Sequence, residues 1–239
     1  STSVGLSGGG AGAGGSGLSL TGAASGSGND ITSTIEASVK SVVFEEEGQI
    51  IEAMTSVSAD GSVSVVTEDR SDIKAFAGGV SGGGSGGAST SGAAAVGASA
   101  AASVVISDVD ATIAGANVSA GGDLTVTAKS LARVISAAIA GAGAGSGSGA
   151  SAMALAGAGA ASINVITNNV DATITNLEDK DNNVNMLTTI AVPEDVVVLA
   201  RDDSSIIANA GAAAVSGAGG SSVGVSGQAG ASLATNVIT

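Results

Sequence analysis

The side chains that could do chemistry in this chain are mainly carboxylates. Its 239 residues include 21 Asp and Glu, seven Lys and Arg, no His and no Cys. Without His there is no imidazole general base, and without Cys or His there is no zinc cluster of the usual kind. Because a phosphate-binding surface needs clustered positive charge, the net charge of −14 also argues against a nucleic-acid partner.

Calcium is the one cofactor that these carboxylates suggest, because hard cations take oxygen ligands. No stretch fits an EF-hand loop, and no tandem Gly-Gly-x-Gly-x-Asp nonapeptide occurs. Acidic turns on a solvated protein would explain the same residues without a metal. We therefore predict no firm metal site and keep calcium as a hypothesis, with the candidate ligands Asp108, Asp110, Asp179, Asp181, Asp202 and Asp203.

Paired carboxylates could also serve glycoside hydrolysis. Asp110, however, recurs in equivalent sequence as Asp171 and as Glu36, which indicates a structural position. The least repetitive acidic pair is Glu68 with Asp72, close to Arg70. We predict that the chain is not an enzyme.

Internal repeats dominate the sequence. Residues 103–113 match residues 164–174 at an offset of 61, and the final segment 236–239 repeats 164–167 at an offset of 72. A weaker copy, residues 35–39, lies 74 residues before the first match. Uncharged Gly/Ala-rich blocks alternate with blocks that hold all the charges, as in a tandem array. We predict one continuous array with the approximate repeats 1–60 (partial, with an insertion), 61–121, 122–194 (with an insertion) and 195–239 (partial).

The period within a repeat is two, which predicts β-strands. In residues 109–113 the apolar side chains alternate with Asp110 and Thr112, and residues 62–66, 124–128 and 196–200 read as further short strands. Ser146–Gly149 reads as a turn between two Gly/Ala runs. Small residues would let two layers approach closer than the usual ~10 Å. The uncharged stretch 134–170 could also be read as membrane helices, but its Gly, Ser and Asn content argues against that.

Residues 114–128 resemble the repeats of bacterial filamentous-haemagglutinin-like adhesins, and the cycle that leads into residues 162–174 is similar to leukotoxin-like filamentous adhesins. The resemblance covers residues 61–239 better than residues 1–60. It implies a large surface or secreted protein with a right-handed β-solenoid shaft, structural or adhesive work, and no catalytic residues.

A β-solenoid coil usually takes fewer residues than the 61 to 74 of this cycle. Each repeat is therefore expected to contain two or three coils, or one coil plus a protruding hairpin. We favour several coils, because Glu36, Asp110 and Asp171 would otherwise stack as like charges unless a cation lay between them. The insertions 40–60 and 176–194 are expected to emerge as loops.

We predict an all-β, elongated β-solenoid (a parallel β-helix) with close-packed Gly/Ala-rich strands and possible protruding hairpins. The expected function is a structural module of an extracellular or cell-surface filament or adhesin shaft. Its partner would be itself, as a homopolymer or as adjacent repeats, and a host or neighbouring cell surface would be a further partner. Both ends fall in mid-repeat, which indicates a segment of a longer chain or a link of a polymer. The alternatives are a cation-dependent or carbohydrate-binding module on the same solenoid, and a membrane-associated Gly/Ala hairpin protein.

Overall fold

The chain folds almost entirely into β-strands. The computed structural model describes the backbone of residues 1–239 and every side chain except that of Ala13. Within these described residues there are 18 strands and no α-helix, so the all-β prediction is confirmed. No described segment forms a helix that is long and apolar enough to span a membrane.

The strands are arranged in four coils, each of which we define by its residues. Coil 1 (residues 1–71) holds β1 (Thr2–Ala13), β2 (Ser16–Lys40), β3 (Val42–Glu46), β4 (Gln49–Ala53), β5 (Ser56–Ala59) and β6 (Val63–Asp69). Coil 2 (residues 72–132) holds β7 (Asp72–Gly87), β8 (Thr90–Ala114), β9 (Asn117–Ala120) and β10 (Leu124–Ser130). Coil 3 (residues 133–204) holds β11 (Arg133–Ser148), β12 (Ser151–Thr175), β13 (Leu177–Asp179), β14 (Val184–Met186), β15 (Thr189–Ala191) and β16 (Val196–Asp202). Coil 4 (residues 205–239) holds β17 (Ser205–Gly220) and β18 (Val223–Ile238).

Equivalent strands of successive coils pair in parallel and in register. Ser33 lies beside Ser107 at a separation of 74 residues, Thr112 beside Thr173 at 61, and Thr167 beside Thr239 at 72. The internal match of residues 103–113 with residues 164–174 is therefore a row of neighbouring strand positions. These continuous parallel ladders make the molecule a β-solenoid, as the sequence predicts.

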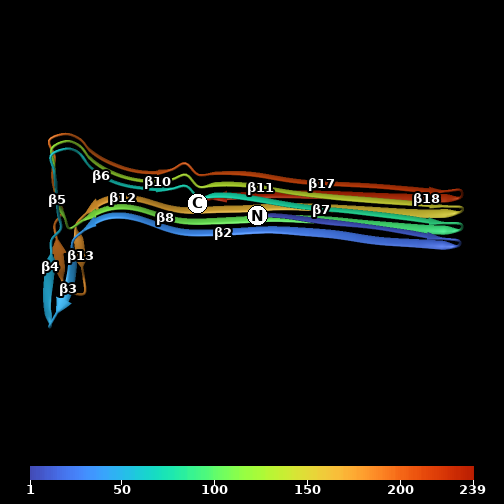
Figure 1. Cartoon of the computed structure of the whole chain (residues 1–239), viewed down its shortest axis with the longest axis horizontal. Coiled ribbons are helices and arrows are strands. Elements are labelled where there is room, and N and C mark those ends of the chain that lie inside the picture. The colour runs from blue at the N-terminus through green and yellow to red at the C-terminus, as the bar shows by residue number, and fades with distance from the viewer.

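Each coil has two parts, which we call the arm and the head (Figure 1). The arm is two layers of long strands: an upper sheet of order β1-β7-β11-β17 and a lower sheet of order β18-β12-β8-β2. The head is three-sided, and its walls are the near ends of the lower-sheet strands, the sheet β15-β9-β5 and the sheet β16-β10-β6. Upper and lower strands meet at the far tip of the arm.

The expectation that each repeat contains several coils is wrong, because every repeat is a single coil. Its length comes from the arm, in which the chain runs out along the upper sheet, turns and runs back along the lower sheet without winding round the head. The alternative expectation, one coil with a protruding hairpin, is the arrangement found. The strands of the Gly/Ala blocks are also longer than expected, with 16 residues in β11 and 25 in β12, and the turn between them follows Ser148.

The interior of the arm contains small side chains. Its core consists of alanines such as Ala75, Ala138 and Ala154, which are fully buried, with buried serines between them. Inward glycines bring the two layers into backbone contact: a Cβ added to Gly79 would lie 2.1 Å from the carbonyl oxygen of Ala98 on the other layer. The expected close approach of the two layers is therefore found.

The head encloses a wider space and fills it with larger side chains. Its core combines residues from all three walls, including Val109, Ile113, Val118, Leu124 and Val126. These β-branched and aliphatic side chains suit a pleated surface that is buried on one face. Their burial stabilises the head by about 25 cal/mol per Å² of apolar area.

The close approach of the layers predicts opposite effects for two neighbouring glycines. Gly79→Ala should lower the free energy of unfolding by about 1–3 kcal/mol, because its methyl group would meet the backbone of Ala98. In Gly78→Ala the added methyl group points outward, where a Cβ meets nothing within 4 Å. This variant should leave the free energy of unfolding unchanged or raise it slightly. Urea unfolding followed by circular dichroism measures both variants. Equal stability of the two would mean that the layers are not in contact at this position.

Candidate functional site

The two insertions expected from the sequence form hairpins at the same corner of the head. β3 and β4 make one hairpin in coil 1, and β13 and β14 make the other in coil 3. Coil 2 passes this corner without a hairpin, through Gly115 at φ +61°. The hairpins therefore lie on either side of a coil that lacks one, and both project from the corner in Figure 1.

Local chemistry explains each turn. Glu47 and Gly48 both have positive φ values (51° and 79°), as a two-residue hairpin turn requires. In the second hairpin the carboxylate of Asp179 accepts the backbone N–H groups of Asp181 and Asn182, each at 3.1 Å. These hydrogen bonds hold the pKa of Asp179 below its ordinary value, and the largest contribution comes from the side chain of Asn182.

Hydroxyl groups tie the bases of the hairpins to the coils. The backbone N–H of Thr55 donates to the Ser41 hydroxyl at 2.8 Å, and the Thr55 hydroxyl donates to the Lys40 carbonyl at 2.7 Å. In the other hairpin the Thr188 hydroxyl accepts the N–H of Gly115 in coil 2 at 2.7 Å. The second hairpin is therefore attached to the coil that has none of its own.

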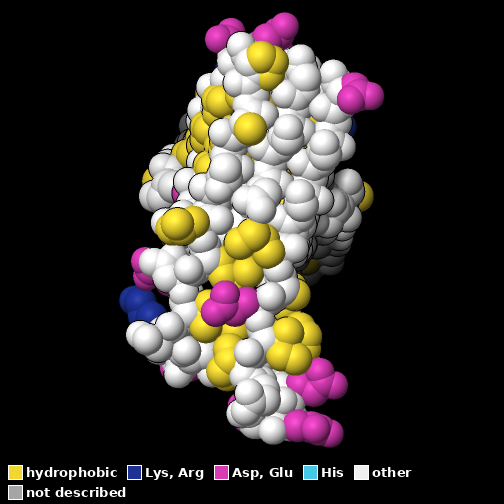
Figure 2. Space-filling view, turned by 90° about the vertical axis from the view of Figure 1, so that its left-hand side faces the viewer, with side chains coloured by type: hydrophobic (Ala, Val, Ile, Leu, Met, Phe, Trp, Pro, Cys, Tyr) yellow, Lys and Arg dark blue, Asp and Glu magenta, His cyan; other side chains and the backbone are white. Residues whose placement is uncertain are grey.

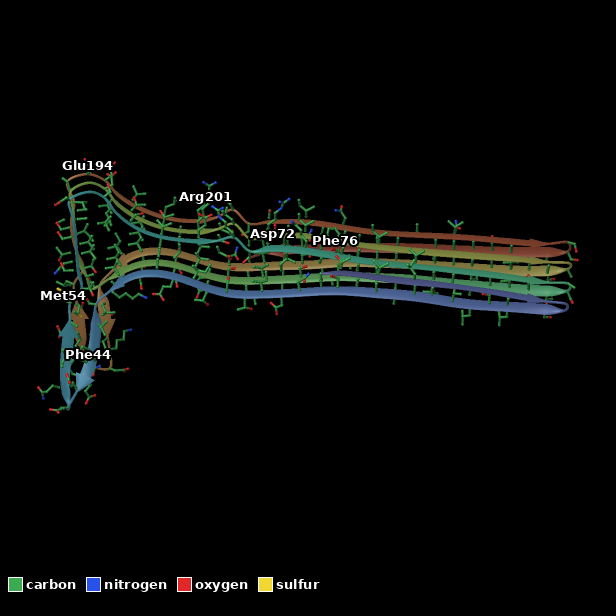
Figure 3. All side chains as sticks on the ribbon, in the orientation of Figure 1. Phe44, Met54, Asp72, Phe76, Glu194 and Arg201 are labelled. Carbon is green, nitrogen blue, oxygen red and sulfur yellow. The ribbon has the colours of Figure 1, made fainter. Side chains whose placement is uncertain are left out.

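An open groove of ≈ 480 Å³ separates the two hairpins. One wall is formed by residues 41–43 and the other by residues 177–181. The second wall carries three carboxylates and only one cationic side chain, that of Lys180. The lining also includes the apolar side chains of Val42, Val43 and Leu177. Phe44, labelled in Figure 3, is exposed on the first hairpin beside this wall, and Figure 2 shows hydrophobic and acidic side chains together at this end of the molecule. The groove thus combines acidic and apolar groups, which suits a cationic or amphipathic ligand.

A second acidic feature lies on the outer face of the lower sheet where it forms a wall of the head. Glu36, Asp110 and Asp171 occupy directly opposite positions on three neighbouring strands. The expectation that a spacing of two or three coils separates these carboxylates is wrong, since one repeat is one coil. Asn169 donates from Nδ2 to Asp108 at 3.0 Å, and Lys40 forms an ion pair with Glu36. The positive charge of Lys40 offsets part of the repulsion within the row.

The pKa of Asp110 shows the cost of this arrangement. Burial raises it above the ordinary value of a carboxyl group, and this is the largest cause. The charges of Asp108, Asp171 and Glu36 raise the pKa further, while Lys40 lowers it. The folded state is thus destabilised by ionised Asp110, and this effect disappears as the pH falls through the raised pKa.

The remaining calcium candidates are dispersed. Asp202 accepts hydrogen bonds from the side chain of Asn168 (3.1 Å) and the backbone of Ser204 (2.9 Å), and Asp203 pairs with Arg201 at 2.7 Å. Asp202 is the last residue of β16 and Asp203 follows it. The neighbouring Arg201, labelled in Figure 3, lies away from the hairpin that carries Phe44. Among the residues that the structure describes, no group of three or more acidic side chains is arranged to hold a metal ion.

One buried carboxylate was missed by the sequence analysis. Asp69 is the last residue of β6, and its side chain points inward. It is only 4% exposed and accepts hydrogen bonds from the hydroxyls of Ser71 (2.8 Å) and Ser107. The period-two pattern of residues 63–69 could have placed it inside, since Val63, Val65 and Thr67 share its face. Glu68 and Asp72, the pair considered for catalysis, instead pair with Arg70 and Lys74.

Comparison of the chain with protein-family models, with curated proteins and with solved structures gives no match.

The stacked carboxylates predict that Asp110→Asn stabilises the protein. At neutral pH the substitution should raise the free energy of unfolding by about 1 kcal/mol, because like charges directly opposite each other are destabilising. The gain should shrink as the pH is lowered through the raised pKa of Asp110, where the native carboxyl group becomes neutral. Thermal unfolding at several pH values measures this difference.

The matched control is Asp30→Asn, because Asp30 lies on the same face opposite Val104, with no acid beside it in the neighbouring strand. It should have little effect at any pH. An Asp110→Asn gain that persisted unchanged in acid would contradict the electrostatic explanation.

Proposed function

We propose that this chain is a structural segment of an extracellular or cell-surface filament or adhesin shaft, which associates with itself by stacking β-strands. The observation that carries the proposal is the unbroken parallel register from β1 to β17 and from β2 to β18. Each coil contacts its neighbours, so stability is a sum over coils and their interfaces, and further coils can be added without changing the earlier ones.

The two ends of the stack support this proposal. β1 and β2 lie at one end and β17 and β18 at the other, and each is an edge strand of its sheet. An edge strand presents unpaired backbone N–H and C=O groups, which can pair with another chain. The partner at these edges would be a second copy of the chain or adjacent repeats of the same longer polypeptide.

The distribution of polar groups is consistent with a structural role without catalysis. The repeated acids Glu36, Asp110 and Asp171 follow the architecture of the coils, and the least repetitive pair, Glu68 and Asp72, is occupied by ion pairs. The resemblance of residues 114–128 to filamentous-haemagglutinin-like repeats favours the same role and a location outside the cell.

A second candidate function is a binding surface on the same solenoid, favoured by the groove between the hairpins. The groove would bind a cation, or it would bind a carbohydrate on a host or neighbouring cell surface. Calorimetric titration with calcium tests the cation: a saturable heat that is lost in Asp179→Asn would support this function, and the absence of heat would contradict calcium binding.

Axial stacking predicts different effects for two neighbouring alanines of β17. Ala214 faces the other layer and Ala213 faces outward. An inward-pointing charge on an edge strand prevents a further strand from stacking on it. Ala214→Lys should therefore abolish end-to-end growth, while Ala213→Lys should leave it largely intact.

Electron microscopy of the concentrated protein measures thread length and axial repeat in both variants. Threads as long in Ala214→Lys as in the unmodified chain, or no threads from the unmodified chain at any concentration, would contradict axial self-association. Circular dichroism confirms that each variant keeps its strand content.

A further inference from the structure

The outer face of the lower sheet in the arm is apolar and carries almost no charged side chains. We call it the arm face and define it by the outward residues of β8 between Thr90 and Ile106, with their neighbours in register on β2, β12 and β18. None of these outward residues is charged except Asp30, at the head-side margin. The face exposes large apolar side chains: Leu18 78%, Leu20 79%, Val96 54%, Met153 52%, Leu155 48%, Ile163 47% and Leu233 58%.

Large side chains on the arm face lie over glycines of neighbouring strands. The Cδ1 of Leu18 is 3.3 Å from the position of a Cβ on Gly92, and the Cδ2 of Leu155 is 3.2 Å from that of a Cβ on Gly227. The apolar side chains therefore spread sideways over the sheet. The positions over these glycines are therefore partly covered, which leaves a nearly continuous apolar face.

A shallow hollow interrupts this face. It has a volume of ≈ 390 Å³ and lies over the row of small residues Ala98, Gly159 and Ala231, with Leu233 at its side. On the tip side of this row Leu155 is about half exposed and is the one large side chain between Ala94 and Gly227. Leu155 and Gly159 are four strand positions apart on β12, so Leu155 of one arm can enter the hollow of another.

We propose that the arm face binds the arm face of a second copy of this chain, with the two arms antiparallel. This lateral contact is independent of the axial stacking proposed above, because it uses the face of the lower sheet and not its edges. The contact is isologous: Leu155 of each copy packs over Gly159 of the other, about a two-fold axis that passes near Gly157.

The available area is sufficient for a stable pair. At roughly 3.3 Å per residue and 4.8 Å between strands, the four strands of the arm face cover on the order of 1,000 Å² per copy. A standard specific interface buries about 800 Å² per partner, and an exposed apolar patch of this size marks an interaction site. The outer face of the upper sheet is poorer in apolar side chains, because two of its rows are glycine alone: Gly10, Gly84, Gly145 and Gly217, and Gly12, Gly86, Gly147 and Gly219.

Charge decides the orientation. The segments 75–107, 134–170 and 204–239 carry no Asp, Glu, Lys or Arg, so the net charge of −14 resides in the head and at the base of the arm. Parallel arms would place two acidic heads side by side. Antiparallel arms place the heads at opposite ends, much farther apart than the ~8 Å Debye length at physiological salt.

The first test is sedimentation equilibrium of the full chain in the Ala214→Lys background, which removes axial growth. The chain should form dimers, and Leu155→Glu should raise the dissociation constant of the dimer by roughly tenfold or more, because it places a charge in the hollow. The control Ile139→Glu adds the same charge on the exposed outer face of the upper sheet and should leave the dimer intact. A chain that stays monomeric, or equal loss in both variants, would overturn the proposal.

A second variant separates the interface from folding. Gly159→Leu fills the hollow, and its Cβ meets nothing within 4 Å in the single chain, so the fold should tolerate it. It should weaken the dimer, whereas Gly143→Leu on the upper sheet, where a Cβ also meets nothing, should not. An unchanged dimer in Gly159→Leu would exclude packing through the hollow.

The orientation is tested with a spin label on Ser151→Cys, because the chain has no other cysteine. Ser151 lies six positions from Gly157 along β12, so its two copies in an antiparallel pair should be about 40 Å apart. A parallel pair would bring the labels within about 20 Å and would overturn the antiparallel arrangement. Flotation with phosphatidylcholine vesicles tests the competing occupant: binding of the unmodified chain that is lost in Leu155→Glu would assign the face to a lipid surface instead.

Discussion

The close approach of two β-layers in the arm is the constraint on which the rest of the structure depends. Where the backbone of Gly79 lies against that of Ala98, there is no room for a side chain at position 79. The layers lie close together along four coils, which explains why Ala, Gly and Ser fill the arm interior. Small side chains contribute little apolar burial individually, so the arm depends on continuous parallel hydrogen-bond ladders together with many close contacts.

The head satisfies a different condition. Three walls enclose a wider space than two layers do, and that space requires the larger side chains of Val109, Ile113 and Leu124. The change from alanine to branched side chains along one strand, β8, marks where the layers separate. The head also carries the charge, which leaves the outer faces of the arm apolar. One chain thus combines a solvated acidic end with an uncharged end whose outer faces are apolar.

Stacking one repeat per coil has an electrostatic cost that the sequence does not avoid. Glu36, Asp110 and Asp171 lie in one row, and the positive charge of Lys40 offsets the repulsion only in part. An array that repeats in register repeats its charges as well. A solenoid distributes its stability over many coils, so the fold can accommodate the destabilising repulsion within this one row of carboxylates.

The sequence by itself determined the strand periodicity and the repeat, and the structure turned the repeat offsets into the register between neighbouring strands. The matches at offsets of 61 and 72 residues became neighbouring positions, as Ser103 with Asn164 and Asn164 with Asn236, because parallel in-register stacking places equivalent residues side by side. Only the tertiary structure decided that each repeat is one coil with a long arm, which face of each Gly/Ala run is buried, and that two distant insertions border one groove. Glycine and alanine are both small, so in an alternating Gly/Ala run either set of side chains could face the interior. The position at which the chain turns at the tip of the arm decides which set is buried.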